Sequence, residues 1–209
     1  IVIKVDSVGL CGSDVRTYSV GSAKIDYPVI LGHENAGYVH EVGKNVTGFA
    51  VGDKVVANPC VPCGHCYYCV NKMPGLCDNL EVAGTSFAGG FAQYMAFPES
   101  ALSRGQIIKL SPDIDLEPMI LCELLASVIK AQSDLGVGLG GTVVIIGSGP
   151  IGCLHAQIAK LRGATTVIMA DLSAQRLDLC KNLGGTHFVD SSKEDLVKGV
   201  MGLTGGRGA

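Results

Sequence analysis

The sequence is poor in charge and carries no basic cluster. Only 17% of its 209 residues are Asp, Glu, Lys or Arg, and the formal net charge is −3. Because no Lys/Arg cluster could neutralise a run of phosphates, a nucleic-acid-binding surface is excluded. No apolar run reaches the length of a membrane span, and no stretch has the pattern of a signal peptide. We therefore expect a cytoplasmic protein without nucleic-acid or membrane partners.

Apolar residues and glycine are abundant instead. The hydrophobic share is 47% and there are 29 glycines, which is typical of a turn-rich globular protein with one large or two small domains. The first residues, IVIKV, have the pattern of the middle of a strand, and the last residues, GGRGA, have the pattern of a turn. We predict a fragment that lacks both ends.

The pattern of residues divides the chain into two parts. Up to residue 110 it predicts β-strands separated by turns, with no helical period of useful length, and so a small barrel or sandwich. These strands are Ile1–Val8, Gly37–Val42, Asp53–Ala57 and Phe91–Phe97. A helix is predicted over Leu116–Asp134.

After residue 141 strands and helices alternate, which predicts a parallel sheet with right-handed crossovers. The predicted strands are Thr142–Ile146, Thr166–Ala170 and His187–Val189. The predicted helices are Pro150–Leu161, one from its cap Ser173 to Leu183, and Lys193–Met201.

Four of the nine cysteines have metal-ligand spacing, in the pattern Cys63-x2-Cys66-x2-Cys69-x7-Cys77. Four thiolates in one short loop can close a tetrahedral shell around Zn²⁺, which is typical of a structural site. Cys60 extends the run upstream, so a 60-63-66-69 register is a formal alternative. Iron–sulfur proteins use similar tight spacing, but with a longer final spacing and a following proline.

A second candidate site is the His33-Glu34 pair, inside the glycine-rich stretch Gly32–Gly37. Alone, such a pair is more often a surface turn than a pair of metal ligands. Cys11 upstream and Cys122-Glu123 downstream are further potential donors. For Cys122 a buried thiol on an apolar helix face is the better interpretation.

A third motif follows the predicted strand Thr142–Ile146 and opens a helix: Gly147-Ser148-Gly149-Pro150-Ile151-Gly152. Glycines at these positions allow a tight turn, close approach to a pyrophosphate and close helix–strand packing. Asp171 closes the next strand, where a carboxylate binds the adenosine ribose and repels a 2′-phosphate. Arg176 could accommodate that phosphate, but with Asp171 present we predict NAD rather than NADP.

Together these motifs resemble the zinc-containing medium-chain alcohol/polyol dehydrogenases. The resemblance covers essentially the whole chain and rests on Gly32-His33-Glu34-x2-Gly37-x5-Gly43-x2-Val46, on Cys11-Gly12-Ser13-Asp14, on Gly90-Phe91-Ala92-x-Tyr94 and on the cysteine and glycine motifs. Glu123 with Leu125-Ala126, and the stretch from Asp171 to Leu177, look closest to the sorbitol dehydrogenase branch.

The resemblance implies a fold in two parts. Residues 1–112 would form a GroES-like β-barrel catalytic domain, with a structural zinc lobe at 60–80. Residues 113–209 would form the first half of an NAD-binding Rossmann domain, a doubly wound parallel sheet. The full-length parent would be a homodimer or homotetramer.

The resemblance also implies a catalytic zinc held by Cys11 and His33, with Glu34 and Glu123 as the carboxylate candidates. Ser13 would pass the alcohol proton outward. Where many members complete this relay with histidine the chain has Arg16, a poor proton shuttle. Leu124 replaces a usual proline, and Lys130 stands where histidine is common.

The expected reaction moves a hydride between a secondary alcohol or polyol, resembling sorbitol, and NAD. L-Threonine or a simple secondary alcohol is the alternative substrate. A non-catalytic zinc-binding module is a rival of a different class, and Cys11, His33 and the cysteine lobe weigh against a zinc-free quinone-reductase-like relative. The 209 residues alone are predicted to be inactive, because half of the nicotinamide site is absent.

Overall fold

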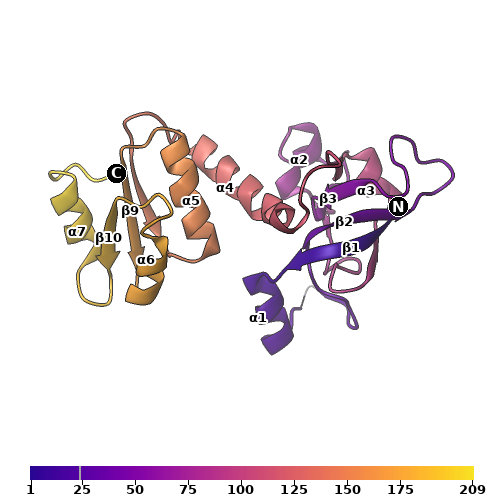
Figure 1. Ribbon diagram of the computed structural model, residues 1–209, viewed down its shortest axis with the longest axis horizontal. Coiled ribbons are helices and arrows are strands. Elements are labelled where there is room, and N and C mark those ends of the chain that lie inside the picture. Colours follow the sequence, from indigo (N-terminus) through magenta and orange to yellow (C-terminus); the bar gives the residue numbers. More distant parts are fainter. Residues whose placement is uncertain (24) are drawn as a thin grey trace. The chain divides into compact units, whose positions relative to one another are not determined.

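An antiparallel five-stranded sheet supports the N-terminal part of the chain (Figure 1). The computed structural model describes residues 1–23 and 25–209. The strand order is β6-β1-β2-β3-β7. The strands are β1 (Val2–Gly9), β2 (Glu34–Glu41), β3 (Lys54–Ala57), β6 (Tyr94–Ala96) and β7 (Ile107–Lys109). A separate antiparallel pair consists of β4 (Cys60–Val61) and β5 (Glu81–Val82).

One face of this sheet forms an apolar core. Its buried residues come from every strand of the sheet, since burial on one face selects alternate positions along a strand. Among them are Ile3, Val39, Val55, Met95 and Ile107. Around the sheet lie the short helices α2 (Tyr67–Val70), η1 (Pro74–Leu76), α3 (Glu99–Ser103) and η2 (Glu117–Leu121). Of these, η2 packs against β1 and β2.

The helix α1 (Gly12–Val20) corrects the prediction that this part of the chain has no helix of useful length. Its sequence shows no apolar stripe because Asp14 is its one buried residue. The signal lies instead in the cap. Cys11 precedes the helix, and the Asp14 carboxylate accepts a hydrogen bond from the Cys11 amide at 3.0 Å, the reciprocal pairing of a capping box.

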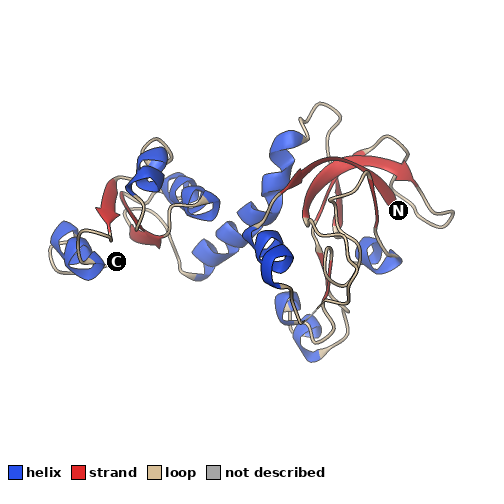
Figure 2. Ribbon diagram, turned by 90° about the horizontal axis from the view of Figure 1, so that it is seen from below, coloured by secondary structure: helices blue, strands red, loops and turns tan. Residues whose placement is uncertain are grey.

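The C-terminal part is built on a parallel sheet of order β10-β9-β8. Its strands are β8 (Thr142–Ile146), β9 (Thr166–Asp171) and β10 (His187–Asp190). The helices are α4 (Cys122–Asp134), α5 (Pro150–Leu161), α6 (Ala174–Cys180) and α7 (Leu196–Leu203). Figure 2 shows the strands in red and the helices in blue.

Helices cover both faces of this sheet, as a doubly wound fold requires. Val167 and Met169 pack with α5 and α6 in one cluster. Ile168 and Ala170, which alternate with them along β9, pack with Val200 of α7 in another. Burial on both faces explains why the four central residues of β9, Val167–Ala170, are all apolar.

The prediction of alternating strands and helices is confirmed, with changes at the ends of two helices. The α6 helix ends at Cys180 instead of Leu183. The α7 helix begins at Leu196 instead of Lys193, because Asp195 caps it by accepting a hydrogen bond from the Lys198 amide.

The chain divides into two compact units, Ile1–Glu123 and Leu124–Ala209. This division lies beyond the predicted boundary at residue 112, since η2 packs with the first sheet. In the described residues, no helix combines the length and the apolar character needed to cross a membrane.

Candidate metal centres and dinucleotide-binding loop

Cys11 lies close in space to His33 and Glu34, although it is far from that adjacent pair in the sequence. Their ligand atoms all lie within 4.8 Å of one another. The antiparallel pairing of β1 with β2 explains this, because Gly9 at the end of β1 faces Glu34 at the start of β2. Cys11 then follows β1, and His33 precedes β2.

Asp14 connects the Cys11 and His33 sides of this group, and sequence reasoning gave it no role. Asp14 is 4% exposed, and its carboxylate accepts hydrogen bonds from the amides of Cys11 at 3.0 Å and Gly32 at 3.3 Å. One of its oxygens also lies 3.5 Å from Nδ1 of His33. The signal that could have found it is the Cys-x2-Asp spacing, which places a carboxylate at the third position of the helix that Cys11 caps.

Glu34 is 5% exposed and has an electrostatically unfavourable position. Burial raises the pKa of its carboxyl group, and the charges of Glu123 and Asp14 raise it further. A hydrogen bond with the Cys11 side chain and the charge of His33 act in the opposite direction. A buried carboxylate of this kind is stabilised by a cation, and a thiol, an imidazole and a carboxylate are donors that Zn²⁺ accepts.

The other two predicted catalytic residues are not members of this group. Glu123, in the first turn of α4, is close enough for its charge to raise the pKa of both Glu34 and Cys60. It is nevertheless outside the set of mutually close donors among the described residues. Ser13 lies in the first turn of α1 and is exposed, as is Arg16.

A glycine-rich loop holds the segment that leads to His33. The backbone amides of residues 89–91 donate to the carbonyls of residues 30–32 at 2.7–3.0 Å. The two backbones approach so closely that a Cβ at Gly89 would lie 2.6 Å from the carbonyl oxygen of Leu31. Such an approach is possible only with glycine.

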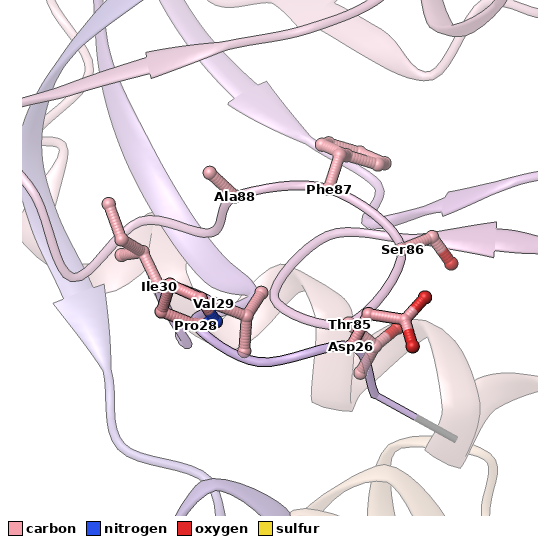
Figure 3. Close-up of a pocket in the computed structure, with 8 residues that line it drawn as sticks. All are labelled: Asp26, Pro28, Val29, Ile30, Thr85, Ser86, Phe87 and Ala88. Atoms are coloured by element: carbon pink, nitrogen blue, oxygen red, sulfur yellow. The ribbon is translucent and has the colours of Figure 1, made fainter.

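The stretches that precede these two paired segments, together with Ile30, line a pocket of about 680 Å³. Figure 3 shows Asp26 and Pro28–Ile30 on one segment and Thr85–Ala88 on the loop that faces it. The lining combines apolar side chains with polar groups, among them the carboxylate of Asp26 and the hydroxyls of Thr85 and Ser86. The pocket therefore adjoins the chain segment that carries His33.

The four cysteines of the predicted lobe form a second group, with all four sulfur atoms within 4.8 Å of one another. Cys60 is outside the group, so the 63-66-69-77 register is the one formed. Hydrogen bonds, first that from the His65 amide, lower the pKa of the Cys63 thiol to about 6, whereas burial raises that of Cys69 to about 12. Four converging thiols fit a closed zinc shell.

Arg104 joins this cysteine lobe to α3. Its guanidinium donates to the carbonyl oxygen of Cys63 at 2.6 Å. A Cβ at Gly64 would collide with the same guanidinium, and Gly64 has a φ of +81°. A residue outside the cysteine loop, Arg104, therefore helps to hold the lobe in place.

In the second unit the glycine motif forms the turn between β8 and α5. Gly147 has a φ of +101°, and a Cβ at Gly152 would collide with the Gly147 carbonyl oxygen. Gly149 caps α5, and Pro150 and Ile151 are its first residues. The amides of this helix N-terminus are therefore available to a phosphate.

Asp171, at the end of β9, is tied to this loop. Its two carboxylate oxygens accept hydrogen bonds from the amides of Ser148 at 2.7 Å and Ser173 at 2.8 Å. These bonds lower the pKa of Asp171, and the charge of Arg176 lowers it further. The loop and the carboxylate thus form one hydrogen-bonded unit.

Comparison with known families decides the relationship. The profile of the family described as "Alcohol dehydrogenase GroES-like domain" matches residues 1–110, and that of "Zinc-binding dehydrogenase" matches residues 150–209. The chain belongs to the zinc-type medium-chain dehydrogenases. The predicted fold is confirmed with it: a GroES-like domain is followed by a Rossmann-like parallel sheet.

Individual relatives of this family are similar over the whole chain. A sorbitol dehydrogenase of Bacillus subtilis is 35% identical over 213 residues, and an L-threonine 3-dehydrogenase of the same organism is 35% identical over 212. This chain is covered completely in both alignments and spans 59% of the length of each relative.

A crystal structure of a zinc-binding dehydrogenase from Sinorhizobium meliloti, bound to NADP, superposes with a TM-score of 0.86 at 37% identity. The superposition covers 95% of this chain and 56% of that one. The chain therefore corresponds to a little over half of a family member.

Proposed function

We propose that the full-length protein is a zinc-dependent dehydrogenase that transfers a hydride between a secondary alcohol or polyol and NAD. The observation that carries this proposal is the group formed by Cys11, His33 and Glu34. Three protein donors leave a fourth position for substrate, which distinguishes a catalytic zinc site from the closed four-cysteine site. A dinucleotide-binding loop in the same chain supplies the place for the hydride acceptor.

Zinc bound to these donors would lower the pKa of the substrate hydroxyl. We assign Cys11, His33 and Glu34 as the metal ligands, and Glu123 as a second carboxylate close to the centre. Asp14 positions the ligands: accepting a hydrogen bond from Nδ1–H of His33 would leave Nε2 free to bind the metal. Ser13, exposed on α1, is proposed to carry the alcohol proton outward.

We propose a structural role for the second metal. Cys63, Cys66, Cys69 and Cys77 would hold zinc in a closed shell that orders the lobe around α2. Because these thiols must stay reduced to bind zinc, we place the protein in a reducing compartment such as the cytoplasm. From the family resemblance we propose a homodimer or homotetramer.

For the cofactor we propose NAD. Asp171 carries its negative charge at neutral pH, since hydrogen bonds lower its pKa, and a negative charge there disfavours a 2′-phosphate. Because the Sinorhizobium relative was crystallised with NADP, binding of the two cofactors has to be compared directly. The ratio of NAD to NADP affinities of the full-length protein, measured by titration, tests this proposal, and tighter binding of NADP would reject it.

L-Threonine is the second candidate substrate, because the threonine and sorbitol relatives are equally similar at 35% identity. A panel of sorbitol, xylitol, L-threonine and 2-butanol, assayed with both cofactors on the full-length protein, separates the possibilities. Metal analysis of the same preparation should give two zinc ions per chain. One zinc and no turnover would instead favour a non-catalytic zinc-binding module.

A further inference from the structure

The backbone conformation of Gly9 does not explain why a glycine occupies this position. It is the last residue of β1, it is buried, and its φ is outside the left-handed region that favours glycine. A glycine inside a strand weakens the strand, and often marks a place where another group approaches the backbone closely. The requirement at Gly9 is therefore one of space.

The atoms nearest to that space all belong to the side chain of Glu34. A Cβ at Gly9 would collide with Oε2 of Glu34 and would lie 3.1 Å from its Cβ and 3.2 Å from its Cδ. Glu34 is the residue paired with Gly9 across the two strands. Its side chain thus lies flat over the Gly9 backbone, with its carboxylate in hydrogen-bonding contact with Cys11, two residues further along.

We propose that Gly9 is a positioning residue for the metal centre, because its missing side chain forms the slot through which the Glu34 carboxylate reaches Cys11 and His33. This inference rests on the proposed metal centre. Any larger residue at position 9 would turn the carboxylate away from the other two donors. The main collision is with the end of a flexible side chain, so the carboxylate would move while the strand pairing persists.

The test is Gly9→Ala in the full-length protein. Because the substitution misplaces a ligand, the zinc affinity of this centre should fall by about 10–100-fold, the effect usual for residues that orient metal ligands. Competition with a chelator measures this affinity, while the zinc in the cysteine lobe serves as an internal reference. Gly43→Ala is the matched control, since among the described residues a Cβ there meets only Val46, at an ordinary 3.6 Å.

Two further readouts separate positioning from general damage. Co²⁺ exchanged into the centre should show the same altered visible spectrum in Gly9→Ala as in Glu34→Ala. The double variant should bind zinc no more weakly than Glu34→Ala alone, since Gly9 acts through Glu34. If Gly9→Ala lowers the melting temperature, adding Glu34→Ala should restore it by removing the collision.

The outcomes are distinct. Wild-type affinity and spectrum in Gly9→Ala, or additive losses in the double variant, would overturn the role of Gly9 while leaving the metal centre intact. A wild-type protein with a single zinc that Cys11→Ser does not remove would overturn the metal centre, and the role of Gly9 with it.

Discussion

Glu34 in the first unit and Asp171 in the second are carboxylates at the ends of strands, and their surroundings shift their pKa values in opposite directions. Burial and two neighbouring acids raise that of Glu34. Hydrogen bonds from two backbone amides lower that of Asp171. The protein therefore satisfies the charge of Asp171 with its own backbone amides, whereas the surroundings of Glu34 favour its uncharged form in the absence of a bound cation.

The difference shows what each site needs for assembly. The loop around Asp171 is organised by its own backbone hydrogen bonds. The carboxylate of Glu34 lies close to two further acids, Asp14 and Glu123, whose negative charges oppose its ionisation, and a bound metal ion would offset this repulsion. We expect the dinucleotide-binding loop around Asp171 to be preformed, and the metal centre around Glu34 to depend on its ligand for assembly.

The strongest test of this comparison is Cys11→Ser, which removes a donor from the Glu34 group. Zinc should fall from two ions per chain to one, and turnover by about 10³-fold or more, because metal stabilisation of charge is worth several kcal/mol. Metal analysis and steady-state kinetics measure both. Cys122→Ser, a thiol outside both groups, should retain two zinc ions; equal losses in the two variants would break the assignment.

A smaller effect is expected from Asp14→Asn, which keeps the shape of the side chain but removes its charge. Zinc affinity at the Glu34 centre should fall by about 10–100-fold, since Asp14 orients both Cys11 and His33. Chelator competition measures this fall. The exposed Asp6→Asn in the same unit should have no effect, and an unchanged affinity in Asp14→Asn would show that the centre does not depend on this carboxylate.

What could be predicted from the sequence follows the range of the interactions. The loop of residues 147–152 and the four-cysteine lobe were predicted because all their parts lie within short stretches. The choice between Glu34 and Glu123 could not be made, because it depends on the pairing of β1 with β2. Gly9 was missed for the same reason, because its role is a contact with Glu34. Asp14 has a local signal in the Cys-x2-Asp spacing, but its contacts with Gly32 and His33 are long-range.

In the second unit, Asp171→Asn should sharpen the comparison from the cofactor side. Loss of one charge-assisted hydrogen bond to ribose should weaken NAD binding by about 10-fold or somewhat more. NADP binding should change less, because the repulsion of its 2′-phosphate disappears. Titrations with both cofactors give the ratio. Asp178→Asn, an exposed carboxylate of α6, is the control, and a ratio unchanged by Asp171→Asn would separate this carboxylate from cofactor choice.

The smallest effects are changes of local stability with pH in the metal-free protein, and their signs are opposite. Because the folded-state pKa of Glu34 is raised above its ordinary 4.5, the stability linked to this group is complete below that pH and is lost as pH rises through the folded value. Because that of Asp171 is lowered below its ordinary 3.8, its contribution is present above that pH and is lost only as pH falls through the folded value.

At about pH 7, Glu34→Gln should therefore slow amide hydrogen exchange in β1 and β2 relative to wild type, whereas Asp171→Asn should speed it in β8 and β9. At about pH 4 the difference in exchange rate between Glu34→Gln and wild type should have largely disappeared, while the difference between Asp171→Asn and wild type persists. Each variant is compared with wild type at the same pH, so the intrinsic pH dependence of exchange cancels. Faster exchange in Glu34→Gln at neutral pH would mean that the metal-free protein already satisfies the Glu34 charge, and the contrast with Asp171 would fail.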